Sequence, residues 1–361
     1  MEKFGSLAVT LATALVLSPL LMAQRAGASN NGPEDLGTLG GSSSVANGIN
    51  SEGVVVGSAA ITGDAAYHAF AKEKQKTGLI DLGTLSGGSN SSAAGINHSN
   101  VVVGTSDFAD PVYGIVQHAF VYSDGEMKDL GTLGGSSSQG NALNGDGVAV
   151  GFSLLSDEAT THAFYSDPIT GQLADLGALK GGTNSQAWGI DGKGRVSGTS
   201  ETGQTDQFGA PISDAVLWDT SHNIHDLGTL GGSFAQANAI DECGTVVGFS
   251  TTSANPTTSS THAFVYSNGK MTDIGTLGGS FAEATAVIGC EIVVGFSNTT
   301  GDADVHAFGW TKKTGMVDLN KYLPANSGWD LQSANGISRA GVAGGGVHNG
   351  NDRGYVWFFE R

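Results

Sequence analysis

Short apolar stretches alternate along this chain with turns rich in glycine and small polar residues. Val, Ile, Leu, Ala and Phe recur within these stretches, and no apolar stripe at helical spacing runs through them. Short runs rich in β-branched residues and bounded by glycine are typical of β-strands. The pattern therefore predicts an all-β fold and excludes a helical body.

The strand pattern is repeated at a nearly constant period. The motif Asp-Leu-Gly-Thr-Leu-Gly-Gly or a close copy begins at positions 35, 81, 129, 175, 226, 273 and 318, with spacings of 46, 48, 46, 51, 47 and 45 residues. Periods of this size occur in solenoids and in propeller blades. Each unit has room for four short strands, which we name a to d. In the first unit they are expected at residues 45–50, 54–58, 68–72 and 79–85.

The turns between strands a and b have the composition of tight hairpin turns. Examples are Asn50-Ser-Glu-Gly53 and Asn144-Gly-Asp-Gly147. The Asn side chain caps such a turn, and the glycine accepts a positive φ. A four-stranded antiparallel meander repeated around an axis is a β-propeller blade.

The two ends of the chain carry complementary parts of one repeat. The chain begins with strand d alone at residues 35–39 and finishes with strands a, b and c at residues 334–338, 342–345 and 355–359. Pairing of these ends would leave no exposed sheet edge. We therefore predict one seven-bladed propeller over residues 29–361, closed by the N-terminal strand in the last blade. A linear β-solenoid is the alternative, although it needs no such complementarity.

The first 28 residues differ from the repeats. Lys3 is followed by an apolar run over residues 4–23 and by Ala26-Gly27-Ala28, which is typical of a secretory signal peptide and its cleavage site. An uncleaved N-terminal anchor is the alternative. No later stretch is apolar for long enough to span a bilayer. We expect a secreted protein, extracellular or periplasmic, that is free of the membrane after cleavage.

The charge balance argues against nucleic acid as a partner. The chain has 34 acidic and 16 basic residues, a formal net charge of −18, and only 14% of its residues are charged. Such an acidic surface repels phosphates and anionic lipid head groups.

A second recurrent motif, His-Ala-Phe, stands at residues 68–70, 118–120, 162–164, 262–264 and 306–308. Together with Asp-Leu-Gly-Thr-Leu-Gly-Gly and Gly-x-Val-Val-Gly, it makes the chain resemble the extracellular HAF-repeat proteins of bacteria over essentially its whole mature length. The resemblance implies export and a repeat fold, and it brings no assigned reaction, cofactor or catalytic residue. The fourth unit departs with Asp214-Ala-Val216 and the seventh with Arg353-Gly-Tyr355.

Groups present in every blade are interpreted as structural, because a catalytic group is needed only once. Equivalent histidines in different blades lie too far apart to share a metal ion. We expect each to bond a neighbouring backbone group or the recurrent Asp, and each motif Phe to pack in the core. The histidines concerned are His68, His118, His162, His262 and His306.

Candidate binding residues are those at which the units disagree. The fourth unit has the longest b–c loop, at residues 199–213, and an aromatic beside polar groups at a channel mouth suits a sugar ring or a peptide. The candidates are Trp188, Lys180, Asp206 and Phe208, extended by Phe234 and Phe281 of the next two units. Neutral drift in one blade, and additional core for the two phenylalanines, are the alternatives.

Other polar clusters are weaker candidates. His222 and His225 have a spacing seen in metal ligands, but no third ligand accompanies them. Three acidic loop pairs carry the oxygen ligands that Ca²⁺ takes, yet none matches an ordered calcium loop, so solvated loops are favoured. These pairs are Asp107 with Asp110, Asp157 with Glu158, and Asp302 with Asp304. No metal site, cofactor or catalytic residue is predicted.

The two cysteines occupy equivalent positions in neighbouring units. Cys243 and Cys290 are 47 residues apart, each just before strand b. Export and the even count favour a disulfide between the two a–b turns. We therefore predict a chain without a free thiol.

Two functions are compatible with these features. The first is a binding or scaffold module that takes an extracellular glycan or a protein ligand at the b–c loop face near the fourth blade. The rival is a hydrolase or lyase acting on a polysaccharide through loop carboxylates. Two carboxylates converging within about 5–10 Å at the channel mouth would favour the rival. Whether the protein is an enzyme stays open at this point.

Overall fold

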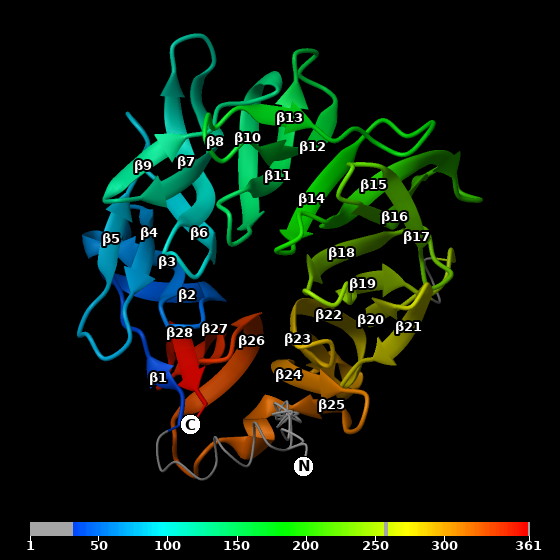
Figure 1. Cartoon of the computed structure of the whole chain (residues 1–361). Helices are drawn as coiled ribbons and strands as arrows, with labels where there is room; N and C mark the ends of the chain where they lie inside the picture. The colour runs from blue at the N-terminus through cyan, green and yellow to red at the C-terminus, as the bar shows by residue number, and fades with distance from the viewer. Residues whose placement is uncertain (1–31, 256–258, 360–361) are drawn as a thin grey trace, which may run out of the picture.

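The computed structural model describes residues 32–255 and 259–359. Seven antiparallel blades of four strands stand around a central axis (Figure 1). Five of them are separate sheets, and the fifth and sixth blades form one eight-stranded sheet through a parallel bridge between Thr261 and Phe281. The expected signal peptide at residues 1–28 lies outside the described residues. The described helices are the short 3₁₀ turns η1 (Thr62–Asp64), η2 (Thr300–Asp302) and η3 (Leu319–Tyr322). Among the described residues, none of these helices is long and apolar enough to cross a membrane.

The strands follow one another from the axis outward in every blade, as strands a to d. The first three blades are β2 (Gly40–Ile49), β3 (Val55–Ile61), β4 (Tyr67–Lys72) and β5 (Ile80–Gly83); β6 (Ser91–Ile96), β7 (Val102–Asp110), β8 (Gly114–Ser123) and β9 (Glu126–Asp129); and β10 (Gly134–Leu143), β11 (Ala149–Leu155), β12 (Thr161–Ser166) and β13 (Leu173–Asp175). The fourth and fifth are β14 (Ser185–Ile190), β15 (Val196–Thr205), β16 (Pro211–Trp218) and β17 (Ile224–Gly228); and β18 (Ala235–Ile240), β19 (Val246–Thr251), β20 (Thr261–Ser267) and β21 (Lys270–Gly275). The sixth is β22 (Gly278–Ile288), β23 (Ile292–Thr299), β24 (Val305–Thr311) and β25 (Gly315–Asp318), and the seventh combines β26 (Trp329–Ile337), β27 (Gly341–His348) and β28 (Asn351–Phe358) with β1 (Glu34–Asp35).

The two ends of the chain share the seventh blade. Strand β1 pairs antiparallel with β28, with Glu34 opposite Val356 and Asp35 opposite Tyr355. Blade seven also reaches blade one, since Asn335 Nδ2 donates to the Ala46 carbonyl over 2.9 Å. The predicted pairing of the termini is confirmed. The opening strand is shorter than the predicted 35–39, because Leu39 bridges to Ile61 of blade one instead.

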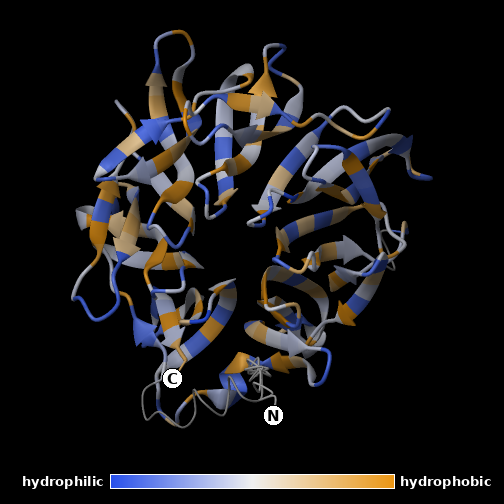
Figure 2. Cartoon of the chain, viewed as in Figure 1, coloured by the Kyte–Doolittle hydropathy of each residue, from blue (hydrophilic) through white to orange (hydrophobic). Residues whose placement is uncertain are grey.

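A glycine in strand b sets the space for the core of each blade. At Gly104 a Cβ would collide with the Ser92 backbone oxygen and would lie 2.8 Å from Cζ of Phe120. The aromatic ring of strand c therefore lies over the bare glycine. The five motif phenylalanines are fully buried, which confirms their predicted place in the core; they are Phe70, Phe120, Phe164, Phe264 and Phe308. Figure 2 shows the alternation of hydrophobic and hydrophilic positions along the strands.

The motif histidines connect strand c to strand d. His68 Nδ1 lies 2.9 Å from Asp81 Oδ1, and the same contact, at 2.8–3.0 Å, recurs in blades two, three, five and six. The predicted bond to the recurrent Asp is confirmed. In blade seven, where Arg353 replaces the histidine, His348 of strand b supplies the contact to Asp35 at 2.8 Å.

Blade four lacks both motif residues and compensates for only one of them. Trp218, two residues after Val216, fills the core with its ring against Gly198 and donates its indole N–H to the Leu176 carbonyl over 2.9 Å. Asp214 stands where the histidine would be and interacts with Asp226. Burial, followed by the Asp226 charge, raises the pKa of Asp214 to about 6. Asp214 is therefore protonated below about that pH.

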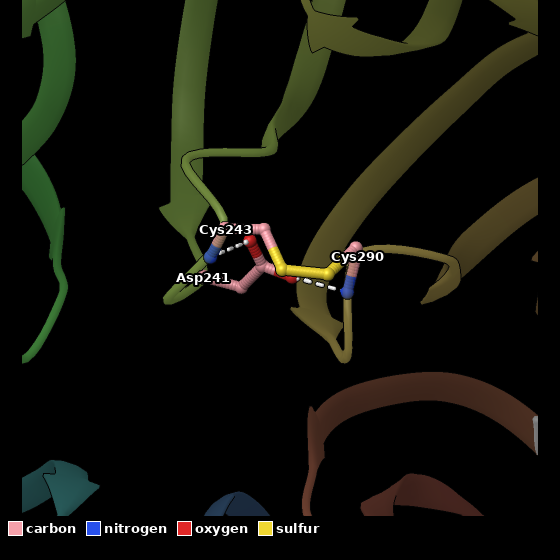
Figure 3. Close-up of side chains that lie close together, drawn as sticks. All are labelled: Asp241, Cys243 and Cys290. Atoms are coloured by element: carbon pink, nitrogen blue, oxygen red, sulfur yellow. Dashed lines mark hydrogen bonds between the residues drawn. A yellow bond between two sulfur atoms is a disulfide. The ribbon is translucent and has the colours of Figure 1, made fainter. Parts of the chain in front are cut away.

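Side chains of the a–b turns link neighbouring blades at the end of the axis opposite to the b–c loops. Asn50 Nδ2 donates to the Asn97 carbonyl over 3.1 Å, and Asn97 Nδ2 donates to that of Asn144 over 3.0 Å. Between blades five and six a disulfide joins Cys243 to Cys290, with 5.6 Å between the Cα atoms. Asp241 bonds the backbone N–H groups of both cysteines (Figure 3). The predicted disulfide is confirmed.

We expect the double variant Cys243→Ser/Cys290→Ser to be less stable than the wild type by about 2–4 kcal/mol, because the bridge limits the freedom of the unfolded chain. Urea unfolding measures the difference. Reductant should lower the wild-type stability to that of the variant and leave the variant unchanged. Thiol titration of the denatured, unreduced protein should find no free thiol. Equal midpoints for both proteins would show that Asp241 alone holds the two turns.

We expect Asp214→Asn to stabilise the protein above about pH 4, with the full gain reached above about pH 6. The raised pKa means that the folded wild type binds more protons than the unfolded chain between about pH 4 and 6, so its stability falls as the pH rises through that window. After allowance for solvent screening the gain is about 1 kcal/mol near pH 8 and none near pH 4. Urea unfolding at several pH values tests this. Parallel pH profiles would contradict the raised pKa of Asp214.

Candidate functional site

The central channel opens on the b–c loop face into a polar cavity of about 560 Å³. Its wall is formed mainly by strand a of several blades, with contributions from strands b and c of blades one and two. At the other end of the channel lies a smaller cavity of about 220 Å³, whose lining includes the apolar residues Ile49, Ile190 and Ile337. The wide mouth is therefore the polar end.

Seven equivalent positions of strand a form a ring around the axis. Asn47 Nδ2 donates to the Ala93 carbonyl of the next blade over 2.8 Å, and four further positions make the same kind of link. Ala94 and Trp188 interrupt this ring. The seven residues are Asn47, Ala94, Asn141, Trp188, Asn238, Thr285 and Asn335.

Trp188 is the only tryptophan among the described residues that line the cavity. Its ring centroid lies 5.8 Å from that of Phe152, which positions the ring on the wall. The indole Nε1 is buried and, among the described residues, has no hydrogen-bond partner. A buried donor without a partner is unfavourable, so Trp188 carries an energetic cost at this position, while its half-buried side chain lines the cavity.

A second ring lies two residues earlier on strand a and holds a single titratable side chain. Glu283 on β22 replaces the glutamines found in blades three, four and five. Asn238 Nδ2 of β18 donates to Glu283 Oε1 over 2.9 Å, and Gln236 Nε2 donates to Asn238 Oδ1 over 2.8 Å. The residues of this ring are Val45, Ser92, Gln139, Gln186, Gln236, Glu283 and Ser333.

The surroundings of Glu283 make its carboxyl group a weak acid. Phe296 is its cross-strand partner on β23, and Phe281 precedes it by two residues on β22, so both rings share its face of the sheet. Burial raises the pKa of Glu283 to about 7, against which the Asn238 hydrogen bond has the smaller, lowering effect. A carboxyl group with this pKa can accept or donate a proton near neutral pH.

One other carboxyl group borders the cavity. Asp107 on β7 accepts hydrogen bonds at Oδ2 from the backbone N–H and the side-chain amide of Asn90, over 3.0 and 2.8 Å. Its oxygens are therefore partly occupied by the wall of blade two. Glu283 belongs to blade six, so the two carboxyl groups approach the cavity from different blades.

The six residues predicted as binding candidates do not form one site. Trp188 lines the central cavity, and Phe234 borders a separate groove of about 380 Å³ that also includes Glu201. Lys180 is exposed in a d–a turn. Asp206 caps the tip of the β15–β16 hairpin, where the side chain of Phe208 is 62% exposed, and neither residue lines the cavity.

Phe281 lies with Phe234 in a row of aromatic rings on blades five and six. The row runs Phe234, Phe249, Phe281 and Phe296, with successive ring centroids 5.7, 6.1 and 5.9 Å apart. All four side chains are half-buried. The row thus packs between blades five and six and provides the apolar surroundings of Glu283.

The remaining polar candidates have local structural roles. His225 Nε2 contacts Asp219 at 2.9 Å, and His222 lies against Tyr165 with the ring centroids 4.1 Å apart. Asp157 caps its own turn by accepting hydrogen bonds from Thr160, and these bonds lower the pKa of Asp157 to about 2. Asp110 and Asp302 also accept backbone N–H groups in turns. The described cluster of Asp241 with both cysteines offers no thiolate to a metal, because the sulfurs are joined.

No protein-family model matches the chain, and no curated protein matches it. Among solved structures, the β-propeller domain of the Trilobed protease from Pyrococcus furiosus is similar, with 10% identity, coverage of 88% of this chain and 96% of that one, and a TM-score of 0.55. The fold is a β-propeller.

Two further propellers have a similar backbone. Oligogalacturonate lyase from Vibrio parahaemolyticus is 11% identical, with coverage of 88% of this chain and 92% of that chain and a TM-score of 0.50. Acylaminoacyl peptidase from Pyrococcus horikoshii is 12% identical, with coverage of 87% and 51% and a TM-score of 0.50. At such identities the likeness establishes the scaffold alone.

We expect Glu283→Gln to stabilise the protein at alkaline pH. The raised pKa makes the folded wild type lose stability between about pH 4.5 and 7, because its carboxyl group must ionise while partly buried. The variant, which carries the residue of blades three to five, should be more stable by up to about 3 kcal/mol near pH 8 and equal near pH 4. Urea unfolding measures this, with Glu126→Gln on exposed β9 as the control. Identical behaviour of both variants would contradict the buried acid.

Proposed function

We propose that this protein is an exported binding module that takes a glycan in the polar cavity at the b–c loop face of its channel. The observation that carries the proposal is the placement of one half-buried indole among amide and hydroxyl groups in the wall of the cavity. Export is supported by the N-terminal segment and by the disulfide. The proposal also keeps the relationship to HAF-repeat proteins that the motifs indicate.

The chemistry of the wall favours a saccharide over a peptide. Sugars present hydroxyl groups that both donate and accept hydrogen bonds, and an amide side chain carries both an NH₂ donor group and a carbonyl acceptor. Asn141, Gln139 and Gln236 line the cavity beside Trp188, whose ring can pack on the apolar face of a sugar. A volume of about 560 Å³ lies in the range of small-molecule sites.

A second candidate function is a hydrolase or lyase acting on a polysaccharide. The observation that favours it is Glu283, whose pKa of about 7 suits a general acid or base. Asp107 is the other carboxyl group among the described residues that line the same cavity, and paired acid chemistry requires two such groups within about 5–10 Å of each other. On this reading Glu283→Gln would retain binding and lose turnover.

We expect Trp188→Ala to weaken glycan binding at least tenfold, a loss of about 1.4 kcal/mol or more. The fold should tolerate the change, because blade two carries Ala94 at the equivalent position. Calorimetric titration with neutral oligosaccharides of glucose, galactose and N-acetylglucosamine measures the affinity, and product analysis of each mixture detects turnover.

The matched control is Phe208→Ala at the hairpin tip, which should leave the affinity unchanged because Phe208 lies outside the cavity. Loss of binding in this control with retention in Trp188→Ala would move the site to the fourth-blade hairpin. Binding without product supports the module, whereas product that disappears in Glu283→Gln supports the enzyme.

A further inference from the structure

We propose that the cavity is selective for saccharides that carry a free amine, with the protonated amine bound at Glu283 and the sugar ring on Trp188. This inference rests on the proposed glycan-binding function and adds the class of ligand. The residues that carry it lie on strand a of three consecutive blades: Trp188 on β14, Asn238 on β18 and Glu283 on β22.

The charge of the cavity excludes acidic sugars. Glu283 and Asp107 both line it, whereas no Lys or Arg among the described residues does so. The chain as a whole has a formal net charge of −18. A uronate or a sulfated sugar would therefore enter a field of like charge without a cationic partner, which is unfavourable in a partly desolvated site.

The state of Glu283 favours a cation over a neutral sugar. Oε1 accepts a hydrogen bond from Asn238, and Oε2 has no partner within the described parts of the chain. An ammonium group placed at Oε2 would form a charge-assisted hydrogen bond and would compensate the burial of the carboxylate beside Phe281 and Phe296. A neutral hydroxyl group offers only the weaker, uncharged bond.

The neighbouring groups do not supply that compensation themselves. The side chain of strand β18 that reaches Glu283 is the neutral Asn238, which the neutral Gln236 supports by a hydrogen bond, and β23 contributes Phe296. Around the cavity, the other titratable groups among the described lining residues are Asp107 and Tyr67. Neither of them is a cation. The ligand is thus the one component able to bring the positive charge.

Trp188 adds a second preference for an amino sugar. A cation close to an indole face is attracted by the ring quadrupole, and the attraction increases when the site is shielded from water. Asn238 lies between Trp188 and Glu283 in the order of the blades and is held by its bonds to Glu283 and to the Ala284 carbonyl. Recognition of the ring and of the amine therefore comes from one preorganised arc.

The test is calorimetric titration with trisaccharides of one linkage: a glucosamine oligomer, an N-acetylglucosamine oligomer, a glucose oligomer and a uronate oligomer. Near pH 7.5 we expect the glucosamine oligomer to bind at least tenfold more tightly than the two neutral oligomers, and the uronate to bind least. Near pH 5 the preference should shrink, because Glu283 is then protonated in the free protein.

With Glu283→Gln the glucosamine and the neutral oligomers should bind with equal affinity, and Asp107→Asn should keep the preference. If Glu283→Gln still prefers glucosamine, the cation binds elsewhere on the acidic surface and the inference is wrong. Equal binding of amino and neutral oligomers would overturn the inference and leave the proposed function intact. Absence of binding for all four oligomers would overturn the proposed function itself.

Discussion

The contact between a bare glycine of strand b and the aromatic ring of strand c is the constraint on which this structure depends. A side chain at that glycine would meet the backbone oxygen of strand a, and in several blades also the aromatic ring. Strands a, b and c can therefore approach closely only where glycine is present. The ring then fills the space between neighbouring blades, and its burial contributes about 1.5–3 kcal/mol per blade.

The two blades that depart from the motif show that the volume matters more than the residue type. Blade four has Val216 in place of Phe, and Trp218 reaches the same glycine from two residues further along the strand. Blade seven has Tyr355, fully buried, whose hydroxyl group donates to the Ser333 carbonyl over 2.9 Å. Both rings satisfy their polar atom with a backbone carbonyl, as burial of a donor requires. Packing is thus conserved within the molecule while the sequence of the motif is not.

The same comparison explains which features could be predicted from the sequence. Spacing and turn chemistry were sufficient for the blade number, the pairing of the termini, the His–Asp contacts and the disulfide, because each repeats or follows the period. The cavity could not be predicted in this way, because it arises where strand a of different blades converges on the axis. Glu283 was recognisable only as the one acidic residue in its column of seven.

The length of the b–c loop in the fourth blade misplaced the predicted binding residues of that loop. The long segment at residues 199–213 does not cover the channel, because most of it extends strands β15 and β16 into a projecting hairpin. Backbone hydrogen bonding between the two strands is favourable and continues until the turn at Asp206. The tip therefore carries Asp206 and Phe208 away from the wall on which Trp188 lies. Conformation within a long loop depends on such pairing, which its length does not reveal.

Trp188 and Glu283 share a property that distinguishes them from the structural residues of the ring. Each occupies a position where other blades carry a residue that fits at lower cost: Asn47 or Asn141 for the first, Gln139 or Gln236 for the second. Trp188 gives up the link to the next blade and leaves its N–H without a partner, and Glu283 gives up about 3 kcal/mol at neutral to alkaline pH. Departures from local rules that reduce stability are characteristic of functional positions. Because both residues line one cavity, a single ligand that places an apolar ring face on Trp188 and a positive charge at Glu283 would contact both of them.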